Sequence, residues 1–111
     1  MDAGAPVLVL ITFVDLDQAR RVSEALVAEQ LAACINLFPG VESIYHWKGR
    51  VERAQEVGAV VKTVQSCLGR LEERYKALHS YETPEFLVLP VQGGSVEYLS
   101  WLSQSVAGER P

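Results

Sequence analysis

The feature that most constrains the fold is a pair of long strand-like segments on either side of Gly49. Residues 33–38 are strand-like, and after a bend at Pro39–Gly40 the segment 41–48 alternates between apolar and polar side chains, as a half-buried strand does. The returning strand is predicted at Val57–Val64, with Gly49 in the turn. These strands are longer than a domain of 111 residues needs, so we predict a hairpin that projects and packs against another subunit.

The remaining apolar segments predict two further strands and three helices. The unbroken apolar run Pro6–Val14 is typical of a central strand, and a last strand is predicted at Pro84–Val91. Asp15 with Gln18 resembles a helix N-terminal cap, and Ser66 is predicted to cap the second helix. The apolar stripes of the three helices are Ala19, Val22 and Leu26; Leu68, Leu71, Tyr75 and Leu78; and Val96, Leu99, Leu102 and Val106.

The order strand, helix, strand, strand, helix, strand, helix defines a fold class. It is the split βαβ pattern of ferredoxin-like folds with one added C-terminal helix. We predict a single α+β domain over residues 1–111, with its core at about 6–106 and a frayed GERP tail. Helices would cover one face of a four-stranded antiparallel sheet. The other face carries apolar side chains, so we expect a dimer or trimer to cover it.

Composition excludes several functional classes. The net charge of −4 and the pI near 5.1 do not favour nucleic acid, and residues 57–64 lack the aromatic platform of an RNA-binding sheet. No signal peptide is expected, and the longest apolar run is too short to span a bilayer. Cys34 and Cys67 lie far apart without a metal-binding spacing, which favours a cytoplasmic protein without disulfides.

The stretch HSYETPEF, residues 79–86, is the strongest candidate for a site. His79 has two interpretations: an imidazole that faces the carbonyl end of the preceding helix, or a contact to a metal or ligand. Tyr81, Glu82 and Glu85 belong either to a solvated turn or to acid–base chemistry. No nucleophile with an oriented base is visible, so a hydrolase or transferase using either glutamate is the least favoured hypothesis.

Lys62 stands out because it lies inside an otherwise apolar strand. It is either an exposed lysine whose stem covers apolar neighbours, or a cation at an interface or pocket that faces Glu56 or an acidic ligand. Tyr45 and Trp47 share one face of the hairpin strand, which is typical of an interface core and also compatible with a ligand cage. The sequence alone does not decide between the two roles of Lys62, or between an interface core and a ligand cage for Tyr45 and Trp47.

The longest motifs of the chain resemble those of one known family, the CutA divalent-cation tolerance proteins. They are LVAEQLAACINLFPGVESIYHWKGRVERAQEVGAVVKT, LHSYETPEFLVLPV and YLSWL, in the family's order over roughly Val7–Leu102. The resemblance implies a ferredoxin-like subunit in a homotrimer with intersubunit strand contacts, similar to the PII signalling proteins. It also implies a non-enzymatic role in the response to metal ions, with copper(II) binding in some members.

The resemblance also implies where a metal would bind. In copper-binding members the ligands are a cysteine near the end of the first strand and two adjacent histidines. The matching positions here are Ile11, Leu78 and His79, and Ser80 replaces the usual proline. Any contact to copper(II) or another divalent cation is therefore expected at His79, in a weak and incomplete site.

Other residues in the signature segments are expected to line a cleft between neighbouring subunits, or else to stabilise the trimer. They are Tyr45, Trp47, Lys62, Thr63, Tyr81, Glu82 and Glu85. The first functional hypothesis is a non-enzymatic, trimeric protein of divalent-cation tolerance. The alternative is a PII-like sensor that binds a small anionic ligand at subunit clefts through Lys62 and His79.

Overall fold

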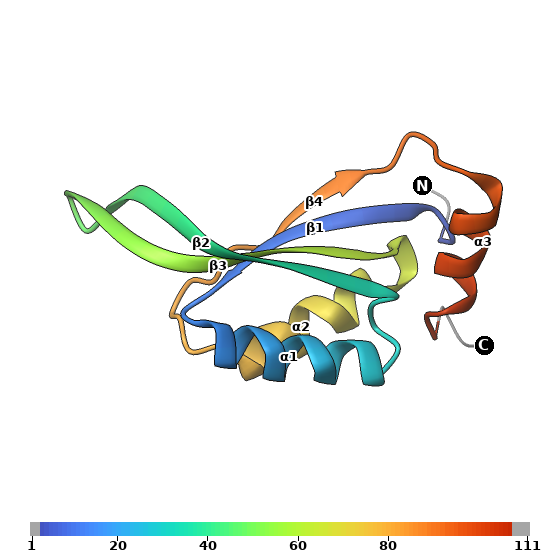
Figure 1. The fold of residues 1–111 in the computed structure, drawn as a ribbon, viewed down its shortest axis with the longest axis horizontal. Coiled ribbons are helices and arrows are strands. Elements are labelled where there is room, and N and C mark those ends of the chain that lie inside the picture. The colour runs from blue at the N-terminus through green and yellow to red at the C-terminus, as the bar shows by residue number, and fades with distance from the viewer. Residues whose placement is uncertain (1–2, 108–111) are drawn as a thin grey trace.

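A computed structural model describes residues 3–107, which form a sheet with two helices packed beneath it and a third at one end (Figure 1). Residues 1–2 and 108–111, which include the GERP tail, lie outside the described residues. The elements are β1 (Pro6–Phe13), α1 (Leu16–Ala28), β2 (Cys34–Trp47), β3 (Arg50–Val64), a short 3₁₀ helix (Gln65–Cys67), α2 (Leu68–Leu78), β4 (Leu87–Pro90) and α3 (Val96–Gln104). This order confirms the predicted α+β split βαβ fold. No helix within residues 3–107 is long and apolar enough to cross a membrane.

The four strands lie in the order β2-β3-β1-β4, and every neighbouring pair is antiparallel. In β1 the odd-numbered side chains from Val7 to Phe13 are buried, while the even-numbered ones are half-buried. Helices α1 and α2 cover the odd face, because side chains of a strand alternate between its two faces (Figure 1). The core on this face includes Val9, Ile11, Phe13, Val22, Leu26, Val61, Leu71 and Tyr75.

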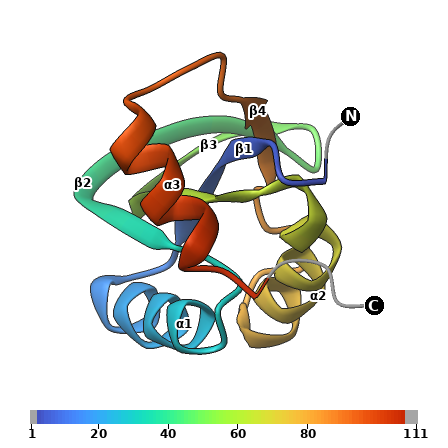
Figure 2. The same ribbon diagram turned by 90° about the vertical axis from the view of Figure 1, so that its right-hand side faces the viewer.

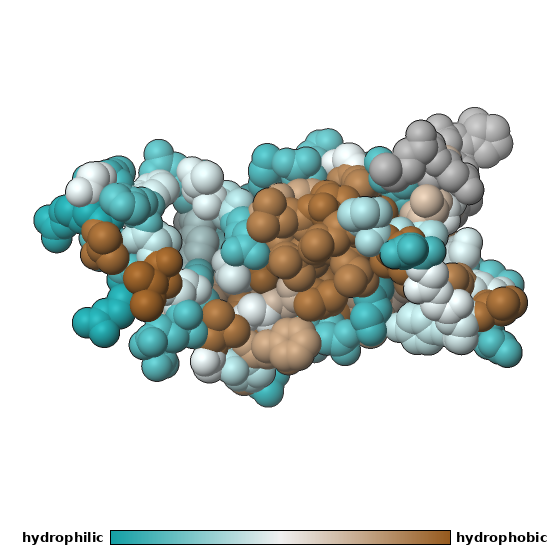
Figure 3. Space-filling model, turned by 90° about the horizontal axis from the view of Figure 1, so that it is seen from above, coloured by the Kyte–Doolittle hydropathy of each residue, from teal (hydrophilic) through white to brown (hydrophobic). Residues whose placement is uncertain are grey.

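The opposite face of the sheet is open within the described chain. Figure 3 shows a continuous apolar area in the middle of this face. The strand register places Leu8 beside Leu89, and Leu10 beside both Val60 and Leu87. Leu87 is 58% exposed and Leu89 is 40% exposed, although both are apolar. An exposed apolar sheet face of this kind is typical of a surface that another chain covers.

The hairpin of β2 and β3 projects beyond the helices, as predicted (Figure 1). The ladder runs to the pair Trp47↔Arg50, and Lys48 and Gly49 both have positive φ angles, of 50° and 79°, as a tight two-residue turn requires. The predicted bend is confirmed as a register shift between Phe38 and Val41. The predicted start of β3 at Val57 is wrong, because cross-strand pairing holds the polar segment from Arg50 onward in the strand.

The predicted cap of α1 is confirmed, whereas the predicted cap of α2 and the predicted bounds of the last strand are wrong. The Gln18 backbone N–H donates to Asp15 Oδ1 at 2.8 Å, so Asp15 caps α1. Ser66 does not cap α2, since it lies inside the 3₁₀ helix and its backbone N–H donates to the Ala3 carbonyl. The last strand spans only Leu87–Pro90, because this is the part that pairs with β1.

Helix α3 lies at the end of the sheet away from the hairpin tip (Figure 1), and it stands in front of the sheet when that end faces the viewer (Figure 2). Ser95 caps it, accepting a hydrogen bond from the Tyr98 N–H. Its inner side contributes to a small second core, formed by Ala33, Val64, Cys67, Leu102 and Val106. The two ends of the sheet therefore differ, with α3 at one end and the free hairpin arm at the other.

Candidate functional site

A cleft of the described chain lies between the hairpin arm and the segment that follows α2. It has a volume of about 680 Å³. Its lining residues are Thr12, Ser43, Ile44, Tyr45, Trp47, Glu56, Tyr81, Glu82, Thr83, Pro84 and Glu85. Five of the residues predicted to line a cleft therefore come together here: Tyr45, Trp47, Tyr81, Glu82 and Glu85.

Two structural elements position these side chains. The arm carries Ser43, Tyr45 and Trp47 at every second position of β2, so they share one side of the strand. The segment 79–86 leaves the end of α2 and runs past the end of β1 toward β4 (Figure 1). Pro84 favours an extended backbone before it, which helps to turn this segment back toward the sheet.

Sequence reasoning missed part of the lining. Ser43 could have been found, because it lies two residues before Tyr45 on the same side of a predicted strand. Thr12 could not, since its position in the cleft depends on how β1 ends beside the segment 79–86. The sequence predicts Glu56 only as a partner of Lys62, and not as part of the lining.

The charge of Glu56 affects two other titratable side chains of the cleft, Tyr81 and Glu85. Tyr81 Oη donates a hydrogen bond to Glu56 Oε2 at 2.8 Å. Partial burial, this hydrogen bond and the Glu56 charge raise the pKa of Tyr81 well above its usual range. Partial burial and the charge of Glu56 also raise the pKa of Glu85. With Glu82, three carboxyl groups line the cleft, and no lysine or arginine stands among the described residues that line it.

His79 uses both ring nitrogens within the chain. Nε2 lies 2.7 Å from the Thr12 carbonyl oxygen, which can only accept, so Nε2 carries the proton. Nδ1 accepts a hydrogen bond from the Tyr81 backbone N–H at 3.0 Å. The ring also stacks on Phe13 and meets the edge of Tyr75. The imidazole is thus a neutral bridge between β1 and the cleft segment.

This geometry bears differently on the two interpretations of His79, the helix-end imidazole and the metal contact. His79 is the C-cap residue of α2, as the helix-end interpretation expects, but its ring bonds to a carbonyl of β1 rather than of α2. The metal interpretation stays a prediction, and a metal at Nδ1 would have to displace the Tyr81 N–H. Across residues 3–107, no group of three or more histidine, cysteine, aspartate or glutamate side chains is placed to hold a metal ion.

Lys62 and Thr63 lie outside the cleft. Lys62 Nζ is 3.3 Å from Tyr98 Oη and 5.5 Å from the centre of that ring, so it faces α3 and not Glu56. Thr63 is fully buried and donates to the Leu31 carbonyl at 2.8 Å. Neighbouring strand residues point to opposite faces, so these two could not line one surface. Thr63 therefore lines no surface of the described chain, and the place of Lys62 in a cleft between subunits stays a prediction.

The fold and the cleft define a class: a small ferredoxin-like α+β protein with an acidic, aromatic-lined cleft beside a projecting hairpin. The family model of the CutA1 divalent ion tolerance protein matches residues 7–105. The chain belongs to this family.

Individual relatives agree with this assignment. The divalent-cation tolerance protein CutA of Thermus thermophilus is 47% identical over 98 residues, covering 88% of this chain and 95% of the relative. The CutA protein of Escherichia coli is 45% identical over 102 residues, covering 92% and 91%. The solved structure of the Thermus thermophilus protein superposes with a TM-score of 0.90 at 45% identity, over 92% of this chain and 99% of that one.

Proposed function

We propose that this chain is a non-enzymatic, trimeric protein of divalent-cation tolerance that binds its cation in the cleft. The observation that carries the proposal is the composition of the cleft. Glu56 from β3 and Glu82 and Glu85 from the segment after α2 open onto one space that no lysine or arginine lines. Partial burial and, after it, the charge of Glu56 raise the pKa of Glu85, and a divalent cation would relieve the repulsion between these two carboxylates.

The ligand set follows from the same geometry. Carboxylate oxygens suit hard divalent cations, which readily keep several water ligands. One chain provides an incomplete set, so in this proposal water or a second chain supplies the remaining ligands. Copper(II) also accepts imidazole, and His79 would reach it only after Nδ1 releases the Tyr81 N–H. The carboxylates are therefore the primary contacts, and His79 is a secondary contact for copper.

The proposed trimer is supported by two surfaces that the described chain leaves uncovered. One is the apolar open face of the sheet, and the other is the arm, where Ile44 is 65% exposed and Val51 is 68% exposed. Association is the economical way to bury them. The number three rests on the family resemblance. Sedimentation equilibrium should give about three times 12.2 kDa, and a species of one chain mass at micromolar concentration would contradict the trimer.

The absence of catalysis is supported by the hydrogen bonds of the described chain. Among residues 3–107, no serine, threonine or cysteine side chain is hydrogen-bonded to a carboxylate or an imidazole, as an activated nucleophile would be. The alternative, a sensor of a small anion through Lys62 and His79, has weaker support. Lys62 faces α3, and the cleft beside His79 is acidic.

The cytoplasm is the proposed location. Cys34 and Cys67 are both free thiols, as is usual in a reducing compartment. Cell fractionation of the source organism would test this proposal, and recovery of the protein outside the cytoplasm would contradict it.

Calorimetric titration with manganese(II) and copper(II) tests the cation proposal. The double variant Glu56→Gln/Glu85→Gln should lose manganese binding, because it removes two carboxylates while it keeps an acceptor for Tyr81. Glu24→Gln, at an exposed position of α1, is the matched control and should bind like the wild type. His79→Ala should weaken copper(II) binding alone. A wild-type protein that binds neither metal, or a double variant that binds as tightly as the wild type, would contradict the proposal.

A further inference from the structure

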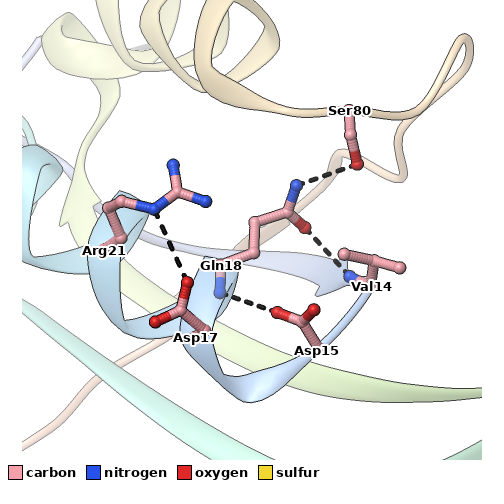
Figure 4. Close-up of polar contacts among 6 residues, drawn as sticks. All are labelled: Val14, Asp15, Asp17, Gln18, Arg21 and Ser80. Atoms are coloured by element: carbon pink, nitrogen blue, oxygen red, sulfur yellow. Dashed lines mark hydrogen bonds and ion pairs between the residues drawn. The ribbon is translucent and has the colours of Figure 1, made fainter.

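The buried side chain of Gln18 joins three parts of the molecule (Figure 4). Gln18 is 5% exposed and lies in the first turn of α1. Its Oε1 accepts a hydrogen bond from the Val14 N–H at 2.9 Å, and its Nε2 donates to Ser80 Oγ at 2.9 Å. The Val14 N–H can only donate, so it fixes which end of the amide points at Ser80.

Ser80 is well placed to affect the cleft, because it directly precedes the lining residues 81–85. This segment has no regular helix or strand structure, so separate contacts must hold it. Its far end is held by Tyr75 Oη, which donates to the Glu85 carbonyl at 2.9 Å. Its near end is held by the His79 bridge from β1 and by Gln18 from α1. Gln18 thus supplies the contact from α1, while Tyr75 supplies the one from α2.

We infer that the Gln18–Ser80 hydrogen bond is a positioning contact for the cation cleft. It holds the start of the segment 80–85 so that Tyr81 reaches Glu56 and the two glutamates of the segment face the same space. A buried amide that loses one partner is unfavourable, so the bond keeps the segment close to α1. The part of this inference that concerns binding rests on the proposed function.

Ser80→Ala is the primary test, because it removes only the hydroxyl that Gln18 holds. In metal-free protein, amide hydrogen exchange across residues 80–85 should become about three- to tenfold faster, as expected for the loss of one hydrogen bond. Manganese(II) affinity should fall by a similar factor. The matched control is Arg21→Ala, which removes an exposed ion pair to Asp17 on the same helix (Figure 4). This control should change neither the exchange of residues 80–85 nor the affinity.

Gln18→Met and the double variant Gln18→Met/Ser80→Ala distinguish two roles of Gln18: holding the segment 80–85 in place, and stabilising only the start of α1. If the contact positions the cleft, the effects of the two substitutions on residues 80–85 are not additive. The inference is overturned if Ser80→Ala leaves exchange unchanged, or if Gln18→Met accelerates exchange only in residues 15–22. It is also overturned if the wild type binds manganese(II) and Ser80→Ala accelerates exchange without weakening that binding. A wild type that binds no manganese(II) contradicts the proposed function, while the exchange data still decide whether the contact positions the segment.

Discussion

The two faces of the sheet are built by the same strands but are buried by different means. On one face, Val9 and Ile11 pack under α1 and α2 and are at most 2% exposed. On the other face, their neighbours Leu8 and Leu10 lie among partly exposed apolar side chains that neither α1 nor α2 covers (Figure 3). The difference shows that one apolar run in the sequence serves two purposes: it builds the core of one chain, and it builds a surface suited to association.

Leu10→Asp should have the largest effect on this comparison, because it places a charge in the middle of the open face beside Val60 and Leu87. Burying that charge in an interface is strongly unfavourable. We expect the assembly to dissociate to single chains of 12.2 kDa, as measured by light scattering after size exclusion. Leu10→Met is the matched control and should keep the assembled mass. An assembled Leu10→Asp variant would mean that the open face is not the interface.

Phe13→Ala and Phe38→Ala compare the same substitution on the two faces. Phe13 is fully buried and packs against Tyr75 and His79, so its loss should lower the free energy of unfolding by about 3–5 kcal/mol. Phe38 is 51% exposed, and its replacement should cost less than about 1 kcal/mol in the single chain. Urea unfolding measures both, with the mass determined in parallel because association also stabilises the fold. Equal losses would remove the distinction between the faces.

Tyr75→Phe and Tyr98→Phe compare the loss of a buried hydroxyl group with the loss of an exposed one. Tyr75 is buried, and its Oη donates toward the carbonyls of Thr12 and Glu85 at 3.2 and 2.9 Å. Its loss should cost about 1–2 kcal/mol in the same unfolding experiment. Tyr98 is 42% exposed and contacts Lys62, so its hydroxyl should contribute less than about 0.5 kcal/mol. A larger effect at Tyr98 than at Tyr75 would contradict this order.

The smallest expected effect is a pH dependence at the edge of the open face, where Glu85 lines the cleft. Its pKa in the folded protein is raised above the ordinary value of 4.5, so the folded state holds this proton more tightly than the unfolded state. Its contribution to the free energy of unfolding is therefore fully present below about pH 4.5 and is lost as the pH rises through the folded pKa.

Glu85→Gln should abolish this contribution, so the stability gap between variant and wild type should shift in favour of the variant from about pH 4 to pH 7. Urea unfolding at a series of pH values, with a chelator present, measures the change. The control Glu24→Gln removes a carboxylate outside the cleft and should keep the wild-type trend. A constant gap between Glu85→Gln and the wild type would contradict the prediction.

The fold was predictable because its signals are local. The apolar stripes and the bend at Pro39–Gly40 gave the correct order of elements, and the strand alternation gave the arm. The start of β3 was not predictable, since residues 50–56 have no strand-like pattern of their own and are held by pairing with β2. Ser66 illustrates the same limit: a residue type that often caps helices here lies inside a 3₁₀ turn.

The candidate site was predictable only in part. Tyr45, Trp47 and the segment 81–85 meet in one cleft of the chain, whereas the signature motifs predict a cleft between subunits. Lys62 and Thr63 do not line the cleft of the chain, because their surroundings depend on where α3 and the loop before β2 pack. The role of Gln18 was also hidden, since its partner Ser80 lies far away in the chain and the contact forms only in the folded molecule.

The central position of β1 has a consequence for synthesis of the chain. Its partners are residues 57–64 on one side and residues 87–90 on the other, so both lie far downstream of it. A nascent chain therefore exposes the apolar run Pro6–Phe13 without a sheet partner until more than half of the protein has been made. Contacts between residues far apart in the chain slow folding and leave apolar segments exposed for longer. We therefore expect chaperones to bind the N-terminal third of the chain during its synthesis.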